Sequence, residues 1–170
     1  MEPSDISSNI LQSTKAKIQI NANLTINDPS AGDIGDIRIA NNTTYTIDAA
    51  NGNVNLLNNG AKIIFEGADS ELDLVNTSNI NDRQFTFYNN LNKSGNDEYG
   101  IVRIGATTKD LTIANNGGPY TIGQDNTHRL KNFIVDGAGN IVVDNTVFTK
   151  LLSMNSTGQV TFNQELDLGA

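Results

Sequence analysis

The sequence predicts an all-β fold and, within that class, a right-handed parallel β-helix (β-solenoid) with protruding loops. Pairs of apolar residues separated by one residue recur along the chain, and alternate side chains of a strand point to opposite faces, so each pair places two side chains on one buried face. From Ile37 to Leu72 the pairs begin 8 or 9 residues apart. Every second pair then gives a period of about 18 residues, which is typical of a solenoid. Asn supplies 26 of the 170 residues and suits tight corners.

The elements follow in order from these pairs. Residues 1–15 contain no strand-like pair and are expected to be an irregular N-terminal lead. This lead lacks the basic and apolar regions of a secretory signal peptide. Residues 16–170 are predicted to form one solenoid domain. Its strands are expected at Ile18/Ile20, Leu24/Ile26, Ile37/Ile39, Tyr45/Ile47, Val54/Leu56, Ile63/Phe65, Leu72/Leu74, Phe85/Phe87, Val102/Ile104, Leu111/Ile113, Tyr120/Ile122, Phe133/Val135, Ile141/Val143, Leu152/Met154, Val160/Phe162 and Leu166/Leu168.

The period also predicts how these strands stack. Each turn is expected to contribute a strand to each of two or three parallel sheets, and the pairs that begin at Ile37, Val54 and Leu72 are expected to lie above one another as parallel ladders. Short strands separated by turns also fit an antiparallel β-sandwich or jelly roll. The Asn-Gly dipeptides at residues 51–52, 59–60 and 116–117 support that alternative, because Asn-Gly favours the turns of β-hairpins.

The largest interruption of the pattern lies near residues 88–101, and its residues 89–100 are the most polar in the chain. We interpret this segment as a loop that projects from the framework, and binding residues concentrate on loops that a rigid scaffold carries. Tyrosines flank the loop, and tyrosine is enriched at protein interfaces. The predicted contact surface comprises Tyr88, Asn90, Asn92, Lys93, Asp97, Glu98 and Tyr99. The alternative is an insertion without a role, whose tyrosines fasten the loop to the framework.

The composition argues against several classes of function. The chain has no cysteine and a single histidine, His128, which we interpret as a loop residue. No catalytic triad and no zinc site is therefore expected, and no cofactor is predicted. The net charge is −8 and no cluster of Lys or Arg occurs, so nucleic acid is not an expected partner. No apolar run is long enough to span a bilayer, so no membrane insertion by this segment is expected.

One group of carboxylates supports an enzymatic alternative. Asp69, Glu71 and Asp73 share parity around Leu72 and Leu74, so they could project from one outward face about 7 Å apart. Glycoside hydrolysis requires two carboxyl groups that face each other across the sugar bond. No second cluster of Asp, Arg or Lys accompanies the three in the sequence. We therefore interpret them as a solvated, charged face that discourages lateral aggregation.

The C-terminal part of the chain carries a family likeness. The segments Ile141–Asn145, Asn155–Asn163 and Leu166–Ala170, together with 44–49 and 54–57, resemble passenger repeats of bacterial autotransporters, in particular the surface cell antigens of the rickettsial group. The resemblance covers residues 16–170. It implies a right-handed β-helix passenger that is exposed outside the outer membrane and acts in adhesion to or invasion of host cells. The family offers no motif by which binding residues can be transferred to this chain.

The sequence and the resemblance together predict a non-catalytic, surface-displayed passenger segment. A host-cell or matrix protein is the expected partner, and the passenger is expected to be a monomer. A structural fibre or stalk segment, whose solenoids are commonly trimeric, and a carbohydrate-active β-helix enzyme remain as alternatives.

Overall fold

A computed structural model of the chain describes residues 18–20, 24–26, 37–57, 62–91 and 98–169. These residues form strands, turns and bends, and none of them belongs to a helix long and apolar enough to cross a membrane. The strands are β1 (Ile18–Ile20), β2 (Leu24–Ile26), β3 (Ile37–Ile39), β4 (Thr44–Asp48), β5 (Val54–Leu56), β6 (Ile63–Phe65), β7 (Glu71–Asn76), β8 (Arg83–Phe87), β9 (Ile101–Ala106), β10 (Leu111–Asn115), β11 (Thr121–Ile122), β12 (Asn132–Gly137), β13 (Ile141–Val143), β14 (Thr146–Phe148), β15 (Leu152–Ser156), β16 (Val160–Phe162) and β17 (Leu166–Asp167).

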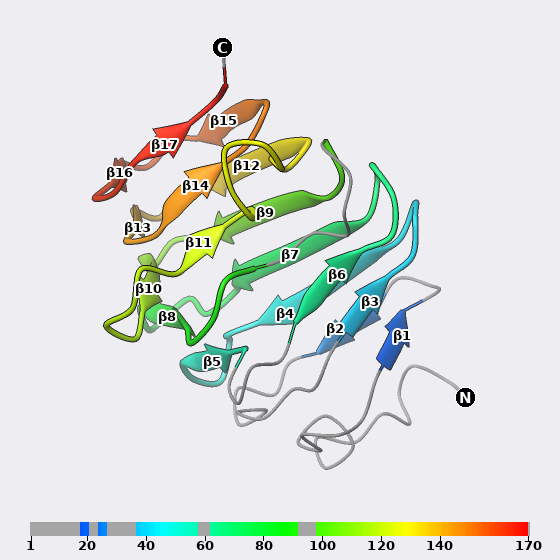
Figure 1. Cartoon of the computed structure of the whole chain (residues 1–170). Helices are drawn as coiled ribbons and strands as arrows, with labels where there is room; N and C mark the ends of the chain where they lie inside the picture. Colours follow the sequence, from blue (N-terminus) through cyan, green and yellow to red (C-terminus); the bar gives the residue numbers. More distant parts are fainter. Residues whose placement is uncertain (1–17, 21–23, 27–36, 58–61, 92–97, 170) are drawn as a thin grey trace.

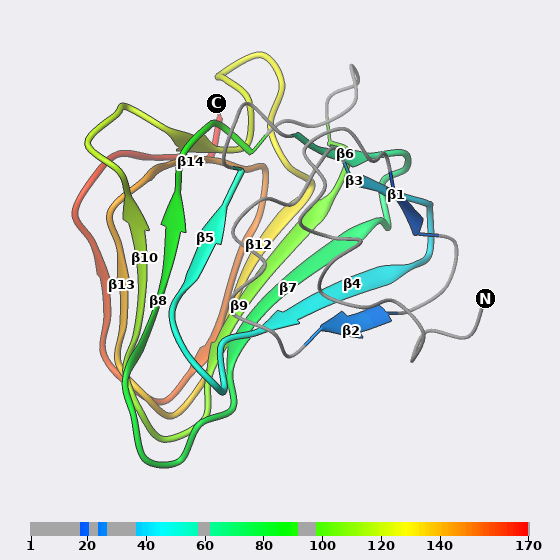
Figure 2. The ribbon, with the colours of Figure 1, turned by 90° about the horizontal axis from the view of Figure 1, so that it is seen from below.

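The strands build a three-sided solenoid (Figures 1 and 2). One side is a six-stranded sheet, here called sheet B, in the order β15-β12-β9-β7-β4-β2. The second side is sheet C, in the order β16-β13-β10-β8-β5. The third side carries two smaller stacks, sheet A (β1-β3-β6) and sheet D (β11-β14-β17). Every ladder between these named strands is parallel, which confirms the solenoid and excludes the antiparallel sandwich.

The predicted period near 18 residues is wrong, because the chain runs around three sides in each turn. In the described residues the turn that begins at β7 has strands on two of these sides only, β7 and β8. Ile37 pairs with Ile63 and not with Val54. Val54 pairs instead with Phe85. The pairs at Ile37, Val54 and Leu72, which were expected in one ladder, therefore lie in sheets A, C and B. The short step between successive apolar pairs is one strand and one corner, and three such steps close the turns that carry a strand on every side, such as the turn from β12 to β15.

The apolar pairs form the core, as the alternation predicts. Leu72, Leu74, Phe85 and Phe87 are fully buried, and the same holds for most pairs of the middle turns. Of the Asn-Gly dipeptides, residues 59–60 lie outside the described residues, and the other two do not form hairpins. Residues 51–52 lie at the corner between β4 and β5, and residues 116–117 lie in the turn that leads from β10 towards β11. In the second of these turns Gly117 has a φ of 75°, a left-handed conformation that glycine adopts at little cost.

The third side changes its strands partway along the stack. Sheet A ends at β6, and sheet D begins with β11. The segment between β8 and β9 joins the two: Leu91 forms a parallel bridge with Ile122, whereas the amide of Gly100 donates to the carbonyl of Gly67, 3.2 Å away. The two ends of the predicted loop thus lie where one stack of strands gives way to the other.

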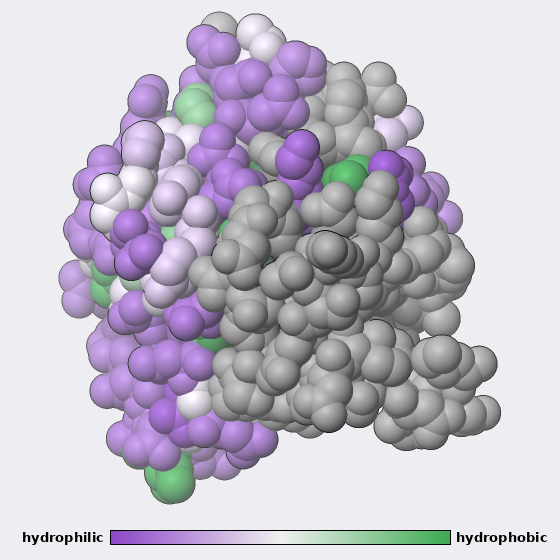
Figure 3. Space-filling model, turned by 60° about the horizontal axis from the view of Figure 1, so that its bottom comes forward, coloured by the Kyte–Doolittle hydropathy of each residue, from purple (hydrophilic) through white to green (hydrophobic). Residues whose placement is uncertain are grey.

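The last turn is less covered than the turn beneath it. Val135 is fully buried, but Met154, its partner in the parallel register, is 48% exposed. Phe162 is likewise only partly buried, although its partner Val143 is fully buried. The outer surface is otherwise polar: the described part of the face in Figure 3 is largely hydrophilic, with isolated apolar spots.

Candidate functional site

The predicted contact surface is only partly described by the structure. Asn92, Lys93 and Asp97 lie outside the described residues. Of the remaining positions, Tyr88 and Tyr99 are both half-buried. They stand at the two ends of the third side, because Tyr88 directly follows β8 of sheet C and Tyr99 precedes β9 of sheet B. The two tyrosines therefore flank the loop, and each offers part of its surface to solvent.

Asn90 belongs to the framework as well as to the loop. Its side-chain oxygen accepts a hydrogen bond from the amide of Thr121, 3.0 Å away on the next turn. The neighbouring amide of Leu91 donates to the carbonyl of Thr121 at 2.9 Å. The pair of bonds fixes the start of the loop against β11, so Asn90 positions the loop, and its acceptor oxygen is already engaged.

Glu98 marks the return of the chain to the framework. It has a φ of 63° and an exposed side chain. Its amide donates to the carbonyl of Arg129 at 3.1 Å, and its carboxylate lies 3.8 Å from the ammonium group of Lys150. Beside it, Gly100 passes so close to Phe65 that a Cβ on the glycine would lie 2.3 Å from the ring. Both ends of the loop are thus held by packing and backbone hydrogen bonds.

The structure adds one ion-pair partner, Arg103, to the carboxylates of β7. Glu71 and Asp73 both lie on the outer face of sheet B, as their parity predicts. Arg103 of β9 donates from Nε to Glu71 at 2.7 Å and also forms an ion pair with Asp136 of β12. Asp69 lies outside this row, at a corner, where it pairs with Lys131. Sequence spacing missed the role of Arg103 because the segment between β8 and β9 lengthens this turn. The step from Leu72 to its partner Val102 is 30 residues (102 − 72), far above the predicted period of about 18.

Asp73 is the least well compensated member of this cluster. One of its carboxylate oxygens is buried without a hydrogen-bond partner. Burial raises the pKa of Asp73 to about 6, and the negative charge of Glu71 acts in the same direction. Arg103 and a hydrogen bond from Thr46 offset part of this increase. A carboxyl group in this setting is partly protonated near neutral pH.

The cluster is a row of ion pairs that runs across three neighbouring strands of sheet B. Arg103 is held between two carboxylates from neighbouring strands, so its charge is neutralised within the sheet face. The hollow next to it, of about 200 Å³, is almost entirely apolar in its lining and includes only Asp136 of the cluster. The described residues contain no group of three or more His, Cys, Asp or Glu side chains that could hold a metal ion.

His128 lies in a tight turn between β11 and β12. Its Nδ1 is 3.1 Å from a carboxylate oxygen of Asp125, and Thr127 donates to the same oxygen from both its amide and its hydroxyl. These hydrogen bonds, that of the Thr127 hydroxyl first, lower the pKa of Asp125. The arrangement closes a turn, and places His128 in a loop as the sequence predicts.

Comparisons with known proteins give one consistent relationship. No protein-family model matches the chain, and no solved structure matches it significantly. The sequence is 38% identical over 156 residues to Outer membrane protein A of Rickettsia rickettsii, which covers 90% of this chain and 6% of that protein. Outer membrane protein A of Rickettsia conorii (strain ATCC VR-613 / Malish 7) is also 38% identical over 156 residues, with 7% of that protein covered. The chain thus spans less than a tenth of the length of these curated relatives.

Proposed function

We propose that this chain is a segment of a surface-displayed passenger of a bacterial autotransporter, which acts without catalysis in adhesion to or invasion of host cells. The observation that carries the proposal is the similarity to two proteins named Outer membrane protein A over 90% of the chain. Those names support a location at the outer membrane or beyond it. The β-solenoid supports the same reading, because it is a rigid framework that holds loops away from its axis.

The proposed contact surface is the loop that runs from Tyr88 to Tyr99. Its two ends are anchored to neighbouring turns through Asn90 and Glu98. A loop with fixed ends loses less conformational freedom on binding than a free one. The two half-buried tyrosines at its ends supply apolar area with a hydroxyl group, which suits a protein partner on the host cell or in its matrix.

The side chains of sheet B favour a structural role over catalysis. An enzyme of the glycoside hydrolase type requires an acid and a base on opposite sides of a bound sugar. Here Glu71 and Asp136 both engage Arg103, and the three groups form one ladder along the sheet face. We therefore assign the cluster to the stability of the solenoid.

Two experiments test the proposal. Antibodies against the purified chain should label intact bacteria, and the absence of labelling would contradict surface display.

Beads coated with the chain should adhere to cultured mammalian cells, and replacing residues 92–97 with a Gly-Ser linker of equal length should abolish adhesion. This replacement keeps Asn90 and Glu98, so the anchors remain. Ile80→Ser, at a 79% exposed corner between sheets B and C, is the control and should adhere normally. Equal adhesion by the linker variant would reject the loop as the contact surface.

A further inference from the structure

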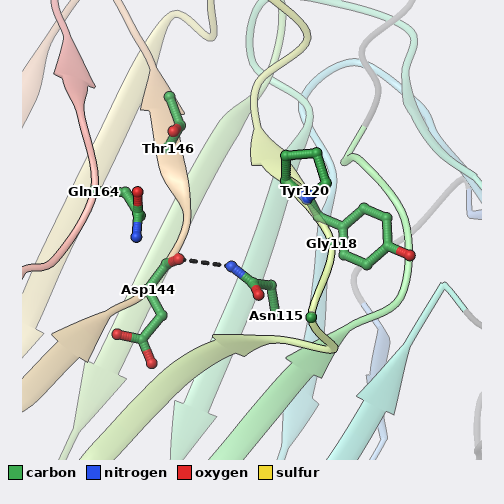
Figure 4. A pocket seen from close by; sticks show the side chains of 8 residues that line it. Asn115, Gly118, Tyr120, Asp144, Thr146 and Gln164 are labelled. Carbon is green, nitrogen blue, oxygen red and sulfur yellow. Dashed lines mark hydrogen bonds between the residues drawn. The ribbon is translucent and has the colours of Figure 1, made fainter.

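A second surface feature, separate from the loop, is a hollow of about 250 Å³ where sheet C passes into sheet D (Figure 4). Three successive turns contribute to it. Asn115 ends β10, and Tyr120 lies in the turn between β10 and β11. Asp144 lies in the turn between β13 and β14, and Thr146 begins β14. Gln164 lies in the turn between β16 and β17. Because parallel turns stack in register, side chains that are far apart in the sequence line one space.

The polar groups of this hollow are incompletely engaged. Within the described part of the chain, the side chains of Thr146 and Gln164 make no hydrogen bond. Asp144 uses one carboxylate oxygen to accept from Asn163 at 2.7 Å, which leaves the other oxygen available. Asn115 donates from its amide nitrogen to the backbone carbonyl of Asp144 at 2.8 Å, so its side-chain oxygen is available too (Figure 4).

The rest of the lining is preformed and partly apolar. Pro119 and Tyr120 contribute to the wall. The Tyr120 ring packs on Gly118, where a Cβ would lie 2.6 Å from the ring. The backbone carbonyl of Tyr120 accepts from the buried side-chain amide of Asn145 at 3.1 Å. The hollow therefore does not depend on a rearrangement to present its groups.

The hydrogen-bond donors and acceptors that line the hollow indicate which kind of ligand it can bind. One carboxylate oxygen, two amides and one hydroxyl can each bond to neighbouring hydroxyl groups, which both donate and accept. None of the described residues that line the hollow is Lys or Arg, so Asp144 would repel an anion. A calcium ion takes six to eight oxygen ligands, usually with several carboxylates, whereas this lining has one. The volume lies below the range of roughly 300–1,000 Å³ typical of drug-sized ligands. We propose that this hollow binds a single unit of a neutral saccharide, with Tyr120 and Pro119 against its C–H groups.

The test is an NMR titration of the full chain with methyl glycosides of glucose, galactose, mannose and N-acetylglucosamine. We expect at least one glycoside to shift the amide signals of Gly117, Thr146 and Gln164 in a saturable manner, with a dissociation constant of roughly 1–10 mM. Thr146→Val keeps the shape of the side chain but removes its hydroxyl group, and should weaken binding roughly tenfold. Asp144→Asn should weaken it as well.

Thr161→Val on the outer face of β16 is the matched control and should bind like the original chain. Each variant is compared with the original by its amide spectrum, so that a loss of fold is distinguished from a loss of binding. If no glycoside shifts these signals, the proposal is overturned. The same holds if Thr146→Val binds equally well, or if only an acidic sugar or calcium chloride produces the shifts. The titration uses no cells, so its outcome is independent of whether the loop mediates adhesion.

Discussion

At the scale of single residues, two glycines near the ends of strands β9 and β12 differ in how much space surrounds them. A Cβ on Gly105 would meet Val75 at 3.5 Å and Asp136 at 3.9 Å, which are ordinary contacts. A Cβ on Gly137, whose φ is 101°, would lie 2.0 Å from the carbonyl oxygen of Ala106. The first position tolerates a methyl group and the second does not.

We therefore predict that Gly105→Ala raises the free energy of unfolding by about 0.5–1 kcal/mol, because alanine restricts the unfolded chain and fills open space. Gly137→Ala should lower it by more than that. Urea denaturation followed by circular dichroism measures both. A lower free energy of unfolding for Gly105→Ala would contradict the prediction that the space beside Val75 accommodates a methyl group.

Asp73 gives a prediction about pH. Its folded pKa of about 6 lies above the ordinary value of 3.8, so between these values the folded state binds more protons than the unfolded state and stability falls as the pH rises. Asp73→Asn should therefore be more stable than the original chain at pH 7, by about 1 kcal/mol after allowance for solvent screening. The difference should vanish below about pH 4. Thermal unfolding across this range measures it.

Asp167 is the matched comparison, because its shift has the opposite sign. Hydrogen bonds from Arg129, at 2.8 Å and 3.1 Å, and from the amide of Gly169 lower the pKa of this carboxyl. Asp167→Asn should therefore lower the melting temperature at neutral pH, and its effect should disappear in acid. If both variants shifted the melting temperature in the same direction at pH 7, the interpretation that the folded state disfavours the ionised form of Asp73 would be wrong.

At the scale of elements, the join between sheets A and D depends on Asn90. Without its side-chain oxygen, the amide of Thr121 would lose its partner, at a cost of about 1–2 kcal/mol. We predict that Asn90→Ala speeds amide hydrogen exchange at Thr121, whereas Asn90→Asp, which keeps an acceptor, does not. Unchanged exchange in the alanine variant would show that water replaces the bond without cost.

The strands themselves could be predicted from the sequence, but their neighbours could not. The alternation that buries Leu72 and Leu74 is local, so it appears directly in the sequence. Which strand lies beside β7 depends on the number of corners in a turn, and the turns of this chain differ in length: the step from Tyr45 to its partner Leu72 is clearly longer than the step from Phe133 to its partner Leu152. The ion pairs of Arg103 and the hollow around Asp144 depend on that stacking. Neither could therefore be found from spacing alone.

At the scale of the whole molecule, the turns differ in length mainly on one of the three sides. From β4 onward, the step from a strand of sheet B to the next strand of sheet C changes little, being longest from β7 to β8 and shortest from β15 to β16. The return from sheet C to sheet B varies far more, because the step from β10 to β12 is much longer than the step from β13 to β15. The third side therefore absorbs most of the variation, and this is the side that carries the predicted loop. Added length is inexpensive there because loop-closure entropy grows slowly with loop length.

We predict that the chain is a monomer in solution, as expected of a passenger. Its lateral faces carry charged and polar side chains, and the large apolar residues exposed on the described surface are few: Ile80, Leu151, Met154 and Leu168. Sedimentation velocity should give a single species of the mass of one 18.3 kDa chain. A trimer would favour the fibre or stalk interpretation.

The half-covered last turn has a consequence for how the isolated chain unfolds and is cleaved by proteases. In a stack where each turn touches only its neighbours, stability is a sum of adjacent contacts, and the turn of β15, β16 and β17 has such contacts on one side only. Detachment of this turn would expose Phe133 and Val143, which are fully buried. A protease that acts on the isolated chain can therefore remove this turn while the turns beneath it stay folded, and the expected product is a fragment that keeps the middle turns.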